Sequence, residues 1–140
     1  MLRHTLFATT IAAASLVVAA SSPAHAEDVQ VMLSGSQEVP PVTSTGSGKG
    51  TITIKDDKTV SGSVTTTGVT GTMAHIHNAA AGKNGPVVIP LSKSGDDGWA
   101  VPAGVKLTDA QYKAFKDGDL YVNVHTAQHQ GGEIRGQLKP

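Results

Sequence analysis

The sequence predicts an all-β protein, an antiparallel, Greek-key-like β-sandwich or barrel with one short helix. Short segments in which apolar and polar residues alternate follow one another along the chain, as expected for half-buried strands. Clusters of Gly, Pro, Ser, Thr and Asp separate these segments and indicate turns. A single segment stands out by its helix-start signals, and because it is the one helix expected, helices contribute little to the expected fold.

The first segment, residues 1–26, is expected to be a cleavable signal peptide. A basic start precedes an apolar stretch over residues 6–20. Ala24 and Ala26 then form the small-residue pattern after which signal peptidases cut. The apolar stretch is shorter than the roughly 20 residues that a membrane span needs, and no stop-transfer charge follows it. We therefore expect one domain over residues 27–140, periplasmic or secreted.

Eight segments of this domain have the alternation or the β-branched composition that is typical of strands. In the first of them, Val29, Val31 and Leu33 alternate with polar residues. Residues 35–50 are rich in Gly, Ser, Thr and Pro and are expected to form a loop, and residues 56–58 a turn. The expected strands are residues 29–33, 51–54, 59–67, 73–77, 86–91, 99–101, 120–126 and 133–138.

The one expected helix starts at a capping box made by Thr108 and Gln111. Basic residues near its end favour the helix dipole, and Gly118 is suited to terminate it. Tyr112 and Phe115 share one face of this helix. We expect these two rings to close one end of the β structure.

Composition excludes several classes of function. The chain has no cysteine, so it has neither disulfides nor thiolate metal ligands, and a blue-copper site is excluded. The whole chain has 11 basic and 11 acidic residues, and loss of Arg3 with the signal peptide leaves a charge near −1. A near-neutral chain without basic runs argues against nucleic acid as a partner. No second apolar segment is long enough for a membrane span after cleavage.

Four histidines lie beyond the expected signal peptide, and they fall in two places. In residues 73–77, alternation sends the apolar pair to the core, so His75 and His77 face away from it. In residues 120–126, the same alternation places His125 on the face away from the core. If these two strands are neighbours, three imidazoles converge on one outer surface.

Three neutral imidazoles with one open position suit copper or zinc. Met73 lies on the histidine face and would add a thioether, which favours Cu(I). His129, four residues beyond His125, is a further candidate ligand. The alternative is structural: outward histidines on strands are commonly solvated or hydrogen-bonded, and methionines commonly pack.

Ordered motifs over nearly all of the expected domain resemble the CHRD (chordin) domain. The resemblance implies a secreted β-rich domain, which occurs within animal chordins and as free-standing bacterial proteins. The motifs are Leu33-x-Gly35-x-x-Glu38-Val39-Pro40-Pro41-Val42, Ala74-His75-Ile76-His77, Gly85-Pro86-Val87-Val88, Leu107-Thr108, Tyr121-Val122-Asn123-Val124-His125-Thr126 and Gly132-Glu133-Ile134-Arg135-Gly136-Gln137-Leu138.

The histidine motifs are also similar to those of copper–zinc superoxide dismutases. That resemblance implies that His75, His77 and His125 bind copper and that Arg135 attracts the superoxide anion. The chain departs from those enzymes because residues 78–123 contain no histidine that could bridge to a zinc ion, and because it has no disulfide. A single, open copper site is what remains.

Three functions follow from these patterns. The first is an exported copper-binding protein with a mononuclear histidine site, used in copper handling or redox protection, with zinc as the alternative metal. The second is a copper-only, superoxide dismutase-like enzyme guided by Arg135. The third is a non-catalytic interaction module in which the histidines are structural. The sequence does not identify a protein partner.

Overall fold

A computed structural model describes residues 24–140. The expected signal peptide falls mainly on residues 1–23, outside the described residues, so cleavage after Ala26 stays a prediction. The elements in chain order are β1 (Ala26–Ser34), the 3-10 helix η1 (Gly35–Gln37), β2 (Ser47–Lys55), β3 (Val60–Thr67), β4 (Gly71–Asn78), β5 (Val87–Pro90), β6 (Ser92–Lys93), β7 (Gly98–Ala100), α1 (Asp109–Lys116), β8 (Leu120–Thr126) and β9 (Ile134–Leu138).

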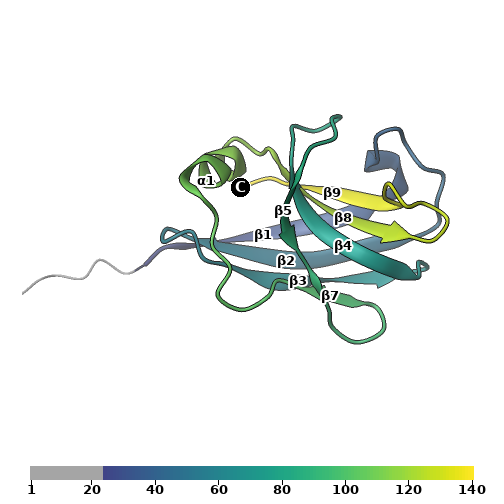
Figure 1. Cartoon of the computed structure of the whole chain (residues 1–140), viewed down its shortest axis with the longest axis horizontal. Helices are drawn as coiled ribbons and strands as arrows, with labels where there is room; N and C mark the ends of the chain where they lie inside the picture. The colour runs from purple at the N-terminus through teal and green to yellow at the C-terminus, as the bar shows by residue number, and fades with distance from the viewer. Residues whose placement is uncertain (1–23) are drawn as a thin grey trace, which may run out of the picture.

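The strands form one antiparallel sheet in the order β5-β4-β8-β9-β1-β2-β3-β7-β6, which confirms the all-β prediction. The two edge strands, β5 and β6, follow each other in the chain with Leu91 alone between them. The sheet therefore curls round into a nearly closed barrel, as Figure 1 shows. Lys93 of β6 supports the closure by donating from Nζ to the Gly71 carbonyl oxygen of β4 at 3.3 Å.

Strand alternation decides which side chains fill the interior. In β1, Val29, Val31 and Leu33 are buried, whereas most residues between them are exposed. Trp99 of β7 packs against the start of β4, where a Cβ at Gly71 would lie 3.0 Å from its ring. The remaining large core residues come from all sides of the barrel: Ile52, Ile54, Val60, Val64, Ile76, Ile89, Leu107, Phe115, Leu120, Val122, Val124, Ile134 and Leu138.

Helix α1 covers one end of the barrel, beside the C-terminus (Figure 1). Its start is the expected capping box: the Gln111 N–H donates to Thr108 Oγ1 at 3.2 Å, and the Thr108 N–H donates to Gln111 Oε1 at 2.9 Å. Phe115 is fully buried against the core, and Gly118 follows the helix with φ +79°. Within the described residues, no helix has the length and apolar character to cross a membrane.

The structure corrects three details of the expected elements. The predicted loop over residues 35–50 ends early, because Ser47 to Gly50 already pair with β1 as part of β2. Its first residues form η1 instead of irregular loop. The expected strand over residues 86–91 is divided, since β5 ends at Pro90 and the short β6 follows it on the other edge of the sheet.

Candidate metal centre

Three histidines meet on the outward face of β4 and β8. These strands are antiparallel neighbours, as the expected convergence of the three imidazoles required. His75 lies opposite Asn123, and His77 lies opposite Tyr121. One ring nitrogen from each of His75, His77 and His125 lies within 4.8 Å of the others. A metal bound at about 2.0–2.1 Å from each nitrogen would bring them to roughly 3.3–3.6 Å apart. The rings thus need only a small rearrangement to ligate one ion.

Hydrogen bonds to backbone carbonyls fix which nitrogens are available. His77 Nδ1 lies 2.9 Å from the Gly85 carbonyl oxygen, and His125 Nδ1 lies 2.7 Å from that of Gln130. A carbonyl oxygen can only accept, so each Nδ1 carries the hydrogen and each Nε2 keeps its lone pair. Metal-bound histidines commonly have this outer bond, which orients the ring and sets its tautomer.

The second ring nitrogen of His77 is a candidate metal ligand. Its Nε2 is buried and has no hydrogen-bond partner among the described residues. Burial lowers the pKa of His77, and its bond to Gly85 opposes this effect. Burial also lowers the pKa of His75, assisted by the charges that His125 and His77 would carry. Both imidazoles are therefore neutral at neutral pH, which is the form that binds copper or zinc.

The histidine face differs from the open surface expected from alternation. Every residue of β8 is buried on both faces of the sheet, and His125 is only 7% exposed. The cause lies in the loops, because the Gln130 and Gly85 carbonyl groups reach the rings from the segments after β8 and before β5. His75 and His77 remain partly exposed, so the loops cover the cluster only in part.

Arg135 lies on the same face of the sheet, from β9, but it is buried rather than solvated. Its Nε and Nη2 each lie 3.1 Å from Glu38 Oε2 in a buried ion pair. Nη1 donates to the Lys83 carbonyl oxygen at 2.9 Å, and Nη2 donates to Asn84 Oδ1 at 2.6 Å. All three guanidinium nitrogens are therefore bonded within the protein.

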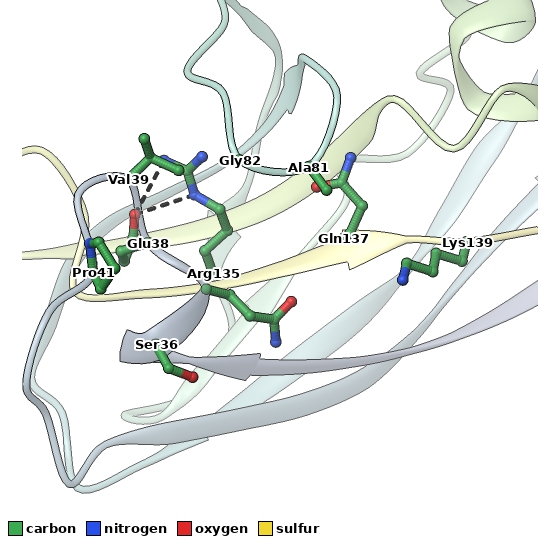
Figure 2. Close-up of a pocket in the computed structure, with 10 residues that line it drawn as sticks. Ser36, Glu38, Val39, Pro41, Ala81, Gly82, Arg135, Gln137 and Lys139 are labelled. Atoms are coloured by element: carbon green, nitrogen blue, oxygen red, sulfur yellow. Dashed lines mark hydrogen bonds and ion pairs between the residues drawn. The ribbon is translucent and has the colours of Figure 1, made fainter.

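Figure 2 shows this ion pair in the wall of a pocket of about 390 Å³. The pocket is lined by Ser36, Gln37, Glu38, Val39, Pro41, Ala81, Gly82, Arg135, Gln137 and Lys139. The three histidines are not among its lining residues, so the pocket is distinct from the histidine cluster. Burial raises the pKa of the Glu38 carboxyl, and the neighbouring Arg135 guanidinium opposes that rise.

The model of the CHRD domain family matches residues 29–138. The chain belongs to the CHRD domain family. No curated protein and no solved structure matches the chain. The match spans all of the motifs that carried the resemblance, including both histidine strands of this CHRD domain.

The remaining candidate ligands of the CHRD domain are placed differently from the three clustered histidines. His129 is half-buried in the loop after β8 and does not belong to the cluster. It stabilises the loop instead, because its carbonyl oxygen accepts from the Thr126 and Gly132 N–H groups. Met73 lies directly opposite His125 in the β4–β8 register and is 52% exposed. A thioether is thus available at the margin of the site.

Sequence reasoning did not find the residues that support the three clustered histidines. Glu38, Tyr121 and Asn123 occur in the family motifs, but those motifs do not show what the residues contact. In the structure Asn123 Nδ2 donates to Glu38, and the Tyr121 ring stacks on His77 with centroids 4.9 Å apart. Gly85 and Gln130 act through backbone carbonyl groups, for which side-chain type gives no signal.

Proposed function

We propose that this CHRD domain is an exported copper-binding protein with a mononuclear site formed by His75, His77 and His125. The observation that carries the proposal is the convergence of three imidazole nitrogens, two of them oriented by backbone carbonyl groups. Imidazole ligands suit copper, and among divalent first-row ions copper binds most tightly to a given site. The expected signal peptide supports a periplasmic or secreted location.

Copper handling or redox protection is the role that we propose for the site. Three histidines leave a coordination position for a further ligand or an exchanging partner, as a carrier or store requires. Zinc is the alternative metal, because the same neutral nitrogens bind it. The exposed thioether of Met73 supports copper over zinc, since soft sulfur favours Cu(I).

Dismutation of superoxide is a weaker proposal for this site. A guiding arginine must offer N–H groups and uncompensated charge to the incoming anion. The Arg135 guanidinium is 3.1 Å from the Glu38 carboxylate and bonded at all three nitrogens. This arrangement favours binding over catalysis. A superoxide-consumption rate above that of free copper, lost in an Arg135→Ala protein that is still folded and loaded with copper, would reverse this preference.

The proposal is tested by metal titration of the exported protein. Cu(II), Cu(I) and Zn(II) are each titrated against the wild type, the double variant His75→Ala/His77→Ala and the control His129→Ala. We expect one copper per chain in the wild type and in the control, and no tight binding in the double variant. Binding that survives the double variant would contradict the site.

Elemental analysis separates copper binding from a purely structural role of the histidines. Protein recovered from the exporting cell's medium or periplasm, without added metal, should contain copper close to one atom per chain. A metal-free protein that co-purifies with a partner would instead favour the interaction module. Zinc in place of copper would keep the site and change the metal.

A further inference from the structure

The carbonyl group that orients His77 belongs to a residue with a second bond. Gly85 accepts from His77 Nδ1 at 2.9 Å, and its own N–H donates to the Tyr121 hydroxyl oxygen at 3.2 Å. There is no room for a side chain here, because a Cβ at Gly85 would lie 1.9 Å from the Asn78 carbonyl oxygen. The ligand, Gly85 and Tyr121 thus form one connected unit.

Tyr121 is itself held between two strands. Its ring is nearly parallel to that of His77, with an interplanar angle of 4° and centroids 4.9 Å apart. The Arg135 guanidinium carbon lies 4.0 Å from the centroid of the same ring. Since β8 lies between β4 and β9, His77 and Arg135 reach Tyr121 from the two neighbouring strands. Contact of this kind restricts where the His77 ring can lie.

Arg135 also fixes the two residues that precede Gly85. It donates to the Lys83 carbonyl oxygen at 2.9 Å and to Asn84 Oδ1 at 2.6 Å. Asn84 in turn donates to the Val39 carbonyl oxygen at 2.9 Å, which joins this segment to the loop after η1. The position of Gly85 therefore depends on a buried guanidinium rather than on the strand ladder alone.

We propose that Arg135 is a positioning residue of the metal centre. Through residues 83–85 and through Tyr121, it keeps the His77 Nδ1 hydrogen on the Gly85 carbonyl oxygen and the Nε2 lone pair toward the metal. The proposal rests on the proposed metal binding at the histidine cluster. It gives Arg135 a role that does not require access to an anion.

Glu38 allows this role because it neutralises the guanidinium. It accepts from Arg135 at 3.1 Å and also from Asn123 Nδ2. Removing Arg135 alone would leave a buried carboxylate unpaired, which destabilises proteins strongly and could prevent folding. The double variant Glu38→Gln/Arg135→Met avoids this, because the introduced glutamine keeps an oxygen for Asn123 and the introduced methionine fills the volume of the arginine stem.

The test compares this double variant with the wild type and with Lys139→Met, which removes a cation just after β9. Lys139 makes no ion pair in the described residues, so this control changes charge without removing any of the positioning contacts. Copper affinity and the Cu(II) electron paramagnetic resonance spectrum are measured for each. Long-range ¹⁵N–¹H NMR of metal-free protein reports the tautomers of His77 and His125 separately.

We expect the double variant to fold cooperatively, to bind copper about 10- to 100-fold more weakly, and to show an altered copper spectrum. Its His77 should lose the uniform Nδ1–H tautomer, whereas His125, held by Gln130, should keep it. The single variant Arg135→Lys should also bind copper more weakly than the wild type, because one ammonium group cannot make the several hydrogen bonds of the planar guanidinium. A folded double variant with unchanged affinity, spectrum and tautomer would overturn the proposal.

Failure of the metal site and failure of the positioning role give different results. If the wild type binds no copper, the proposed function fails. The His77 tautomer in metal-free protein then decides the positioning claim alone. Loss of the Nδ1–H tautomer in the double variant supports it, and an unchanged tautomer refutes it. If the double variant does not fold, Arg135→Lys is measured in the same way, and a wild-type tautomer and affinity there refute the claim.

Discussion

His75 Nδ1 and His125 Nε2 lie 3.0 Å apart across β4 and β8. Since the His125 hydrogen is on Nδ1, bonded to Gln130, its Nε2 must accept, and His75 Nδ1 must donate. A metal ion held by these two nitrogens would replace the shared hydrogen. His75 would then have to carry its hydrogen on Nε2. The hydrogen bond in the metal-free protein would therefore mark the place that the proposed ion takes.

A tautomer change at one histidine is the first prediction. In metal-free protein, His75, His77 and His125 should all carry the hydrogen on Nδ1. Addition of one equivalent of Zn(II), a diamagnetic probe, should move the His75 hydrogen to Nε2 and leave the other two in place. Long-range ¹⁵N–¹H NMR measures this directly. A His75 that keeps Nδ1–H while zinc is bound would show that Nδ1 is not a ligand.

The second prediction concerns acid pH. Burial lowers the pKa of both His75 and His77 below the ordinary value of 6.5. The unfolded chain then binds more protons than the folded one as pH falls through about 6.5, so the free energy of unfolding decreases there. Urea unfolding of metal-free protein from pH 8 to pH 5 measures the loss. The variant His75→Gln/His77→Gln should lose less stability over this range, and an identical loss would contradict the assignment.

The alternation of apolar and polar residues was sufficient to predict the three clustered histidines, but not the residues that surround them. Alternation in residues 73–77 determines that His75 and His77 share a face, because the side-chain period of a strand is two. The same rule places His125 on the corresponding face of β8. The convergence also needed the two strands to be neighbours, which the antiparallel register supplies. The alternation within each strand thus predicted the histidine cluster, given that β4 and β8 pair with each other.

The supporting network could not be predicted in this way. Glu38 and Arg135 are 97 positions apart, and no periodicity connects them. An arginine that alternates away from the core is expected in solvent, yet loops that pack over β8 bury it. Likewise, Ser47 to Gly50 lack strand propensity and form β2 because they pair with β1. Tertiary pairing overrides local composition at these positions.

Metal selectivity is the subject of the third prediction. Met73 lies opposite His125 on the histidine face, and its thioether is exposed. Met73→Leu should weaken Cu(I) binding by roughly tenfold, or about 1.4 kcal/mol, and leave Zn(II) binding unchanged, because sulfur prefers the softer ion. Competition titrations with a Cu(I) chelator measure the change.

Met32→Leu is the matched control for this experiment. Met32 is 74% exposed but lies on β1, away from β4 and β8, so its replacement removes a thioether without touching the site. Cu(I) affinity should be unchanged in this variant. Equal effects of the two substitutions, or none from Met73→Leu, would exclude a sulfur ligand and leave the three imidazoles as the protein donors.

The fourth prediction uses Gly85 to link stability and metal binding. A methyl group at this position would lie 1.9 Å from the Asn78 carbonyl oxygen, so Gly85→Ala must displace backbone. We expect the free energy of unfolding to fall by about 1–3 kcal/mol, as for other overpacked sites. The displacement moves the carbonyl that holds His77 Nδ1, so copper affinity should fall by about 10- to 100-fold as well.

Gly131→Ala provides the comparison for Gly85→Ala, because a Cβ at Gly131 would meet nothing within 4 Å. That variant should keep both the stability and the copper affinity of the wild type. Urea unfolding of metal-free protein and copper titration under folded conditions separate the two effects. If Gly85→Ala lowers stability but binds copper normally, the Gly85 carbonyl group does not orient the ligand. The His77 ring would then be held by its stacking on Tyr121 alone.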